Sequence, residues 1–359
     1  AAMMVLLYHE GQPALNAVGA PDWALGLVGA GYIGVNFFFI LSGFVLTYSY
    51  QTPGGEMRVS RASFWWARFA RIYPLYLIGL LVALPYSFSG LRDGGFLAPM
   101  LLQAWLPNAA LSWNPPGWSL SVEAFFYAVF PLALPWMLRL PTRGLVVSTA
   151  LLWASAMIPS VAYVLFAPDG LGVAANATSN TPWLNAIKFN PVLRLPEFLL
   201  GIVLARLFIE RRVPIEMPRA ARGVAMLGVA GVLVVVLSSA SLPYVFLHSG
   251  LVDPLLAVVI LLAAAEGTPF TGWLGSPVMR LLGDASYALY LLHVPIWQYA
   301  YKALEMLGLA RFWDHPVVFM TIATFAIGAS IVSLKVIERP ARAWLHRLWQ
   351  SRTVLTKRT

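Results

Sequence analysis

Cysteine is absent from the 359 residues, so disulfide bonds, thiolate catalysis and zinc–thiolate sites are excluded. Charged residues are also scarce at 11% of the chain, whereas hydrophobic residues make up 59%. The five histidines are scattered, and none lies in an HExxH or similar metal-binding spacing. The mean hydropathy of +0.73 is outside the range of ordinary soluble domains, so the composition predicts a polytopic membrane protein.

Apolar runs bounded by proline, glycine and charged residues predict an all-α membrane bundle of about ten transmembrane helices. We interpret the first run as incomplete and the chain as truncated at its N-terminus. Residues 96–106 are too short to cross a bilayer and predict a re-entrant or interfacial segment. We expect one membrane domain over residues 1–359, in which 339–359 is a basic tail. The ten predicted spans are 1–8, 27–48, 72–88, 124–138, 144–166, 195–209, 224–239, 251–265, 281–299 and 317–337.

The Lys and Arg residues orient these spans. With ten crossings and a cytoplasmic start, 19 of the 24 face the cytoplasm, as expected when positive charge stays inside. Both termini are then cytoplasmic, and the net charge of +9 reflects this bias rather than a nucleic-acid partner. His9, Trp118 and Glu123 would lie toward the outer ends of their helices. The five outward residues are Arg92, Lys188, Arg194, Lys302 and Arg311.

Glu123 stands at the head of a long apolar run, within residues 115–127 (PPGWSLSVEAFFY). A charged side chain at the bilayer centre costs roughly 2.5 to 3.5 kcal/mol on insertion scales, so we expect a protein partner or a wet cavity. Glu123 could orient a histidine, bind a sugar hydroxyl or hydrogen-bond a neighbouring span. Either Ser119 or Ser121 could cap its helix.

Two further sites carry candidate chemistry. His9 follows the first apolar run, where a neutral imidazole could take a proton from a hydroxyl, or simply end a helix at the interface. Arg68 and Arg71 are three residues apart and share one face if the segment is helical. Paired guanidinium groups suit phosphate binding, and the alternative is a topology anchor within an aromatic belt.

The remaining ionisable residues in apolar runs invite mainly structural interpretations. Arg194 and Glu197 have the spacing of a helical ion pair, and we expect that pair to be structural. Asp284 is expected to cap a helix N-terminus. His293 falls in the middle of a predicted span, where a structural role is harder to assign. Three other histidines lie near loops or in the tail, where solvated roles are expected: His248, His315 and His346.

Several stretches share an order and spacing that runs along nearly the whole chain. They are Tyr8-His9, residues 34–44 (GVNFFFILSGF), 68–74 (RFARIYP), the Trp118 to Tyr127 motif, 194–201 (RLPEFLLG), 283–293 (GDASYALYLLH) and 338–340 (ERP). Together they resemble the acyltransferase family 3 membrane proteins. That family includes O-antigen, exopolysaccharide and peptidoglycan O-acetyltransferases and some antibiotic acyltransferases. It usually carries a basic residue about eleven positions before its histidine, and this chain starts too late to contain one.

The resemblance implies a ten-span bacterial inner-membrane enzyme that moves an acyl group, usually acetyl, from cytosolic acyl-CoA to a hydroxyl. The acceptor would be a carbohydrate or lipid-linked glycan, with the bilayer as the other partner and no permanently bound cofactor. By analogy His9 is the general base or acyl relay, and Glu123 is its partner or a substrate ligand. Arg68 and Arg71 would contact the CoA phosphates. Substrate-binding roles would fall to Trp118, Ser119, Tyr127 and His293.

Two other functions are compatible with the same residues. In a transporter or flippase, Glu123, Arg194, Glu197 and His293 would line a polar substrate path. The absence of a visible internal repeat weakens that reading, because many transporters are built from repeated halves. In a scaffold or sensor subunit, the buried ions would only hold helices together.

Overall fold

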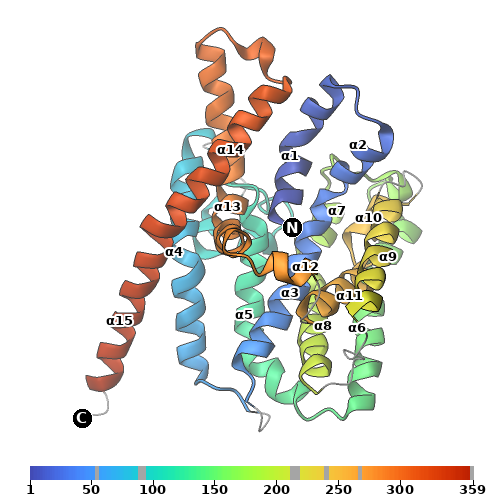
Figure 1. The fold of residues 1–359 in the computed structure, drawn as a ribbon, viewed down its shortest axis with the longest axis vertical. Helices are drawn as coiled ribbons and strands as arrows, with labels where there is room; N and C mark the ends of the chain where they lie inside the picture. The colour runs from blue at the N-terminus through green and yellow to red at the C-terminus, as the bar shows by residue number, and fades with distance from the viewer. Residues whose placement is uncertain (53–55, 88–93, 211–218, 238–241, 266–268, 356–359) are drawn as a thin grey trace.

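The computed structural model describes residues 1–52, 56–87, 94–210, 219–237, 242–265 and 269–355 (Figure 1). Within these ranges the chain is helical, and its one β feature is an isolated bridge between Gln51 and Met57. The predicted all-α class is confirmed. Arg92, Arg211 and Arg212, which contribute to the predicted orientation, lie outside the described residues, as do Lys357 and Arg358.

Helices make up most of the described ranges. The α-helices are α1 (Ala2–Ala17), α2 (Asp22–Gly29), α3 (Gly34–Tyr50), α4 (Arg61–Ser87), α5 (Gly117–Met137), α6 (Thr142–Phe166), α7 (Pro182–Phe189), α8 (Pro191–Ile209), α9 (Arg219–Leu237), α10 (Tyr244–His248), α11 (Asp253–Ala264), α12 (Pro269–Leu274), α13 (Pro277–Met306), α14 (Pro316–Ser333) and α15 (Arg339–Leu355). Short 3-10 helices are η1 (Gly31–Ile33), η3 (Gly95–Met100), η4 (Gln103–Trp105), η5 (Gly172–Ala174) and η6 (Ala310–Phe312), and η7 (Leu334–Glu338) is a π-helix.

Six helical stretches are long and apolar enough to cross a membrane: Asp22–Tyr50, Arg61–Ser87, Gly117–Met137, Thr142–Phe166, Tyr244–Ala264 and Pro316–Ser351. A shorter apolar stretch covers Ala221–Leu237. The other predicted spans coincide with α1, α8 and α13. These findings support a membrane bundle, while ten crossings stay a prediction. Residues 96–106 form only the short turns η3 and η4, too short to cross, as expected.

Three predictions about helix ends and caps are wrong. Helix α1 continues to Ala17, so His9 lies inside it rather than at its end, because polar side chains there face a cavity instead of lipid. Helix α13 begins at Pro277 with Ser276 as its cap, so Asp284 caps nothing and instead bonds Arg339 at 2.8 Å. In α5 neither predicted serine caps: Ser119 and Ser121 donate to the carbonyls of Pro116 and Leu101.

Helices α3 and α8 cross at very short range. A Cβ atom on Gly43 would lie 2.1 Å from the Phe198 carbonyl oxygen, and one on Gly201 would lie 2.0 Å from that of Ile40. Only glycine permits this approach, as in small-residue contacts between membrane helices. The crossing brings the polar residues at the head of α8 against the start of α3.

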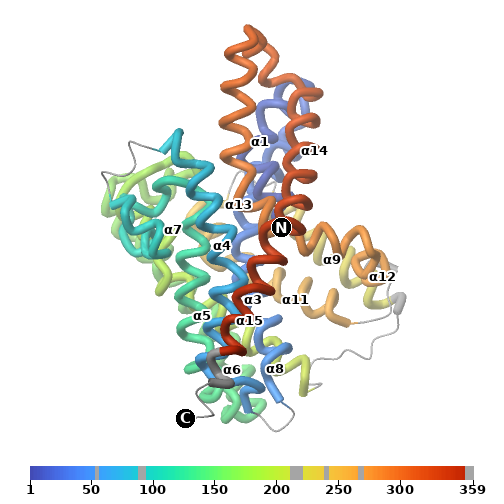
Figure 2. Tube along the Cα trace, turned by 90° about the vertical axis from the view of Figure 1, so that its left-hand side faces the viewer, coloured from blue at the N-terminus to red at the C-terminus, as the bar shows by residue number. Residues whose placement is uncertain are grey.

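The two ends of the bundle differ in charge. The α3–α4 and α5–α6 connections lie at its lower end in Figure 1, and these segments carry Arg58, Arg61, Arg139 and Arg143. The α13–α14 hairpin projects at the opposite end in both views (Figures 1 and 2). Helix α15 descends from α14 along α4, where Trp66 and Trp349 stack. The arginine-rich end is the one that the sequence assigns to the cytoplasm.

Candidate active site

Two neighbouring cavities contain most of the residues that the sequence singles out. The larger, which we name the arginine cavity, has a volume of about 380 Å³ and is lined by Arg68, Arg71, Ser119, Glu123 and Tyr127. The smaller, the histidine cavity, has a volume of about 130 Å³. It is lined by His9, Trp118, Lys188 and His248 together with the tyrosines Tyr8, Tyr32 and Tyr244. Both cavities are walled by Val35 and Tyr290, so these two residues separate them.

Helix α4 directs both arginines into the larger cavity. The predicted helix and the shared face of Arg68 and Arg71 are confirmed. Arg68 donates a hydrogen bond to the Tyr50 hydroxyl at 3.1 Å and lies 5.8 Å from the Tyr127 ring centroid. Arg71 lies 5.5 Å from the ring centroid of Tyr287. Aromatic faces thus orient both cations without neutralising them.

Glu123 faces the two arginines rather than lipid. One turn along α5, the Tyr127 hydroxyl donates a hydrogen bond to Glu123 Oε1. Since the carboxylate also lines the arginine cavity, it has the partner and the polar surroundings that its position in the sequence demanded.

A break in helical geometry supplies the second acid. The π-helix η7 joins α14 to α15, and such insertions occur often at functional sites. It turns Glu338 inward to form an ion pair with Arg71, leaving the Glu338 side chain only 3% exposed. The sequence marked Glu338 only as part of a short motif, because nothing local shows which cation it meets.

His9 is exposed toward the histidine cavity from the middle of α1. Its ring centroid lies 5.3 Å from that of His293, which is fully buried in α13. The predicted mid-helix position of His293 is confirmed. Helices α1 and α13 therefore place two imidazole rings side by side, with His9 at the histidine cavity and the predicted substrate-binding residue His293 behind it, where it lines neither cavity.

The structure does not bring His9 and Glu123 together. They line different cavities, and no contact joins them among the described residues. The predicted substrate-binding set divides in the same way: Trp118 lines the histidine cavity, while Ser119 and Tyr127 line the arginine cavity. Trp118 and Ser119 are consecutive in α5, and successive side chains on a helix of about 3.6 residues per turn point to different faces, so neighbours in one motif line different cavities.

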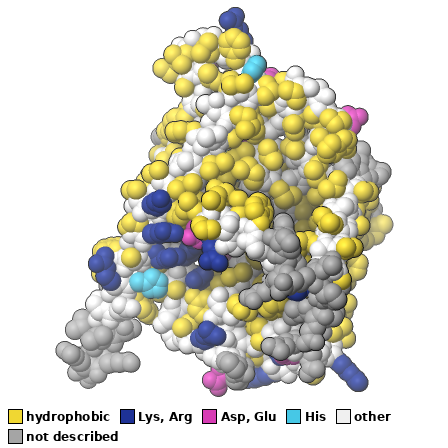
Figure 3. All heavy atoms as spheres, viewed as in Figure 1, with side chains coloured by type: hydrophobic (Ala, Val, Ile, Leu, Met, Phe, Trp, Pro, Cys, Tyr) yellow, Lys and Arg dark blue, Asp and Glu magenta, His cyan; other side chains and the backbone are white. Residues whose placement is uncertain are grey.

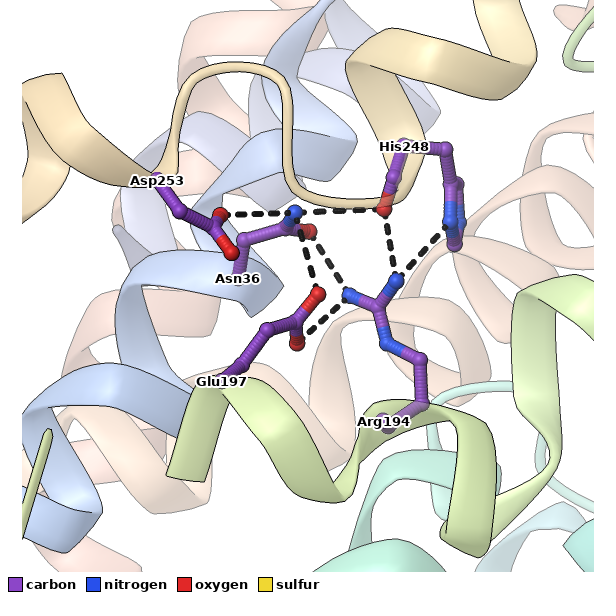
Figure 4. A network of polar contacts seen from close by, with 5 residues as sticks. All are labelled: Asn36, Arg194, Glu197, His248 and Asp253. Atoms are coloured by element: carbon purple, nitrogen blue, oxygen red, sulfur yellow. Dashed lines mark hydrogen bonds and ion pairs between the residues drawn. The ribbon is translucent and has the colours of Figure 1, made fainter. Parts of the chain in front are cut away.

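A polar network joins buried side chains of α3, α8, α10 and α11 (Figure 4), and one of its members, His248, also lines the histidine cavity. The predicted ion pair is present: Arg194 and Glu197 are 3.0 Å apart and each side chain is 1% exposed. Arg194 also donates to Asn36 Oδ1 at 2.8 Å and to the His248 carbonyl at 2.6 Å. Asn36 Nδ2 in turn lies 3.5 Å from Asp253 Oδ1. The network ties α8 to α3 and to the α10–α11 connection.

His248 corrects another expectation. A solvated role was predicted, but the residue is 4% exposed and its ring stacks on Tyr32 at 5.4 Å between centroids. Its Nδ1 lies 3.4 Å from the Arg194 guanidinium. The carbonyl of His248 accepts a hydrogen bond from the buried guanidinium of Arg194, and such a long-range contact is not visible in the local sequence.

Lys188 is a buried cation that the sequence treated only as an outward charge. It is 6% exposed, and Nζ donates to the Ser179 carbonyl at 3.2 Å. No carboxylate forms an ion pair with it among the described residues. The ring centroids of Phe189 and Tyr244 lie 5.1 and 5.8 Å away. Burial lowers the pKa of this ammonium to about 8.

In the described part of the chain, no group of three or more His, Asp or Glu residues could hold a metal ion. The chemistry that these cavities offer comes from an imidazole base, an arginine pair and polar aromatic hydroxyls. An imidazole beside a cavity can move a proton, and paired guanidinium groups can hold an anion.

The profile of the acyltransferase domain family matches residues 1–335. Acyltransferase MdmB of Streptomyces mycarofaciens is 31% identical, over 97% of this chain and 90% of that protein. Peptidoglycan O-acetyltransferase OatA of Listeria monocytogenes is 25% identical over 95% of the chain, which spans only 54% of the relative's length. Exopolysaccharide production protein ExoZ of Rhizobium meliloti is 26% identical over 86% of the chain and 89% of that protein. No solved structure matches significantly.

Proposed function

The chain belongs to acyltransferase family 3, and from this premise we propose that it moves an acyl group, most simply acetyl, from cytosolic acyl-CoA to a hydroxyl of a carbohydrate or related acceptor. The name of the relative OatA, a peptidoglycan O-acetyltransferase, supports the acceptor class. In this proposal the enzyme lies in the bacterial inner membrane with both termini in the cytoplasm. Acyl-CoA is a co-substrate, and no permanently bound cofactor is needed.

The observation that carries the proposal is the adjacency of the two cavities across Val35 and Tyr290. A thioester donor needs an anchor for its phosphates, and the attacked carbonyl needs a nearby base. The arginine cavity offers the phosphate anchor, and the histidine cavity offers the base. The pantetheine arm would pass the wall between them and present the acyl carbon to His9.

In the arginine cavity, Arg68 and Arg71 hold phosphate oxygens of the donor. Forked hydrogen bonds from guanidinium match phosphate geometry, and the surrounding tyrosine rings keep the forks in place. Glu338 forms an ion pair with Arg71, and Glu123 places a second carboxylate in the lining of the same cavity as the two cations. Lys and Arg side chains also gather over the part of the surface that α15 crosses (Figure 3), where Arg342 and Arg347 are exposed. This surface attracts the anionic donor to the same end.

In the histidine cavity, His9 acts as general base. It takes the hydroxyl proton of the acceptor as that oxygen bonds to the acyl carbon, and the carbonyl becomes an oxyanion. When the carbonyl re-forms, the carbon–sulfur bond breaks, and the CoA thiolate receives the proton from His9. The aromatic side chains of Trp118, Tyr8 and Tyr32 give the acceptor an apolar and hydroxyl-lined surface.

The buried ions argue against the transporter alternative. Arg194 and Glu197 bind each other, Asn36 and His248 in a closed network. Glu123 pairs with Tyr127 in a different cavity. A polar substrate path would need these groups to line one continuous passage.

The proposal is tested with purified protein in nanodiscs, supplied with [14C]acetyl-CoA and a panel of methyl glycosides and amino-sugar oligosaccharides. Because the chain has no cysteine, every thiol that an aromatic disulfide reagent detects comes from released CoA. We expect radioactive label on at least one saccharide, with one CoA thiol released for each acetyl group transferred. His9→Asn should lower the rate about 100-fold or more, the usual worth of a positioned base.

The matched control is His315→Asn. His315 is exposed and caps α14 through Nδ1, and asparagine is also a good cap. This variant should retain the wild-type rate. Intact acetyl-CoA with every acceptor, or full activity of His9→Asn, contradicts the proposal.

A further inference from the structure

We infer that His293 is a positioning residue: its Nε2 accepts a hydrogen bond from a ring N–H of His9 and so fixes which His9 nitrogen is the base. The inference deepens the proposed function and rests on it for the role of His9. It assigns to His293 a role other than the substrate contact that the family resemblance implied. Three observations carry it.

The first observation fixes the tautomer of His293. Its Nδ1 lies 2.7 Å from the carbonyl oxygen of Tyr290, one helical turn earlier in α13. A carbonyl oxygen can only accept, so the proton of a neutral His293 must be on Nδ1. The lone pair of the ring is therefore on Nε2.

The second observation is that this lone pair is buried and unused. His293 has 0% exposed surface, and Nε2 has no hydrogen-bond partner among the described residues. An acceptor that is buried without a partner is unfavourable, so such an atom calls for a donor that reaches it in some working state.

The third observation is the position of His9. Its ring centroid is 5.3 Å from that of His293 and tilted by 43°. Its other ring neighbour is Tyr8, which meets it edge-on at 4.8 Å. His9 thus lies within a small rotation of donating an N–H to the free Nε2, as catalytic hydrogen bonds often tighten only when substrate binds.

The chemical consequence concerns both nitrogens of His9. When one N–H is held by His293, the other nitrogen carries its lone pair toward the cavity, where the acceptor hydroxyl must bind. When His9 takes the hydroxyl proton, its positive charge develops next to the His293 lone pair, which stabilises it. A carboxylate does this work in serine hydrolase triads, whereas a neutral imidazole adds no second buried charge.

The test is 15N NMR of the protein labelled at its five histidines, recorded in nanodiscs at a pH where they are neutral. Single His→Asn variants assign the signals. We expect His293 as the Nδ1–H tautomer and His9 as one ordered tautomer. An Nε2–H tautomer for His293 in the unmodified protein overturns the inference without any substitution.

Two variants distinguish the effect of the Nε2 lone pair of His293 from the effect of its side-chain packing. His293→Leu removes the acceptor, so His9 signals should move to the average of two tautomers, and turnover should fall about 10- to 100-fold, as on loss of an orienting partner. The KM for acetyl-CoA should change little, because the arginine cavity is intact. His293→Gln keeps an acceptor near the Nε2 position and should restore most of the order and turnover.

An ordered His9 in the leucine variant, or equal disorder with leucine and glutamine, overturns the inference. The NMR result needs no substrate, so it is independent of acyl transfer. If the wild type releases no CoA, the proposed function fails while the tautomers are still read.

Discussion

At the residue scale, the burial of Lys188 carries an energetic cost. An ammonium group buried on α7 has exchanged water for one carbonyl and two aromatic rings. Burying a charge without an opposite charge is unfavourable, and the fall of its pKa to about 8 expresses that cost. A residue kept at such a cost beside the histidine cavity is a candidate anion contact.

Lys188→Met should stabilise the fold below pH 8. Between pH 8 and the ordinary lysine value of 10.5, the unfolded chain holds a proton that the folded chain has lost, so rising pH stabilises the wild type. Below pH 8 the cost of the buried charge is present in full. The variant should therefore be more stable at pH 7 by about 1 to 3 kcal/mol, with the difference closing toward pH 10.5.

Thermal unfolding in detergent between pH 7 and 10.5 measures the difference in stability between Lys188→Met and the wild type. Lys302→Met is the control, because Lys302 is exposed beside Glu305 and carries no burial cost. A lower midpoint for Lys188→Met at pH 7, or a constant difference across the pH range, would contradict the assignment.

Arg71→Lys should weaken donor binding more than chemistry. Lysine keeps the charge but loses the fork that binds phosphate and stacks over Tyr287. We expect the KM for acetyl-CoA to rise about 10-fold with kcat changed less than threefold, since a lost bidentate contact is worth about 1 to 2 kcal/mol. Initial-rate kinetics measure the KM and kcat for acetyl-CoA. The control is Arg311→Lys, because Arg311 is exposed. An unchanged KM would remove Arg71 from the donor site.

The sequence predicts single residues well where the reason is local. Arg68 and Arg71 share a face because of helical spacing, and Arg194 pairs with Glu197 for the same reason. His248 and Lys188 could not be found in this way. Their burial depends on contacts with segments far along the chain, as when Arg194 reaches Asn36 across 158 positions.

At the element scale, the crossing of α3 and α8 positions the polar network and one wall of both cavities. Each helix contributes a glycine at the point of closest approach, and the opposing atoms are backbone atoms. Backbone cannot move aside as a flexible side chain can. Any added carbon must therefore push the helices apart.

Gly201→Ala should destabilise the protein by about 1 to 3 kcal/mol or more, the usual cost of overpacking. Its Cβ would meet the Ile40 carbonyl oxygen at 2.0 Å and the Phe44 nitrogen at 2.9 Å. Gly228→Ala is the matched control in α9, where nothing lies within 4 Å, and it should be neutral or stabilising by up to about 1 kcal/mol. Thermal unfolding in detergent compares them, and equal midpoints would refute the close crossing.

Helix positions were predictable from apolar runs, whereas several ends were not. Helix α1 continues past its apolar run because His9 faces a cavity, so polarity there does not end the membrane helix. The π-helix at residues 334–338 has no sequence signal of its own, although it turns Glu338 toward Arg71. Patterns report which face is buried, but not whether lipid, protein or a cavity covers it.

At the scale of the whole molecule, the positions of the two cavities and the charges of the two ends support acyl transfer from the proposed cytoplasmic side toward the outer side. The arginine-rich connections mark the proposed cytoplasmic end, and the donor cavity collects two of the chain's arginines. The histidine cavity is reached by the α7 segment, which belongs to the connection predicted to face outward. Sidedness of donor and acceptor is therefore the central claim.

That claim is measured in sealed proteoliposomes, with an oligosaccharide that the protein acetylates in nanodiscs. We predict that [14C]acetyl-CoA outside labels oligosaccharide sealed inside, that both substrates on the same side give no product, and that His9→Asn abolishes the label. Labelled oligosaccharide formed when both substrates share one side, with none across the membrane, would contradict the account.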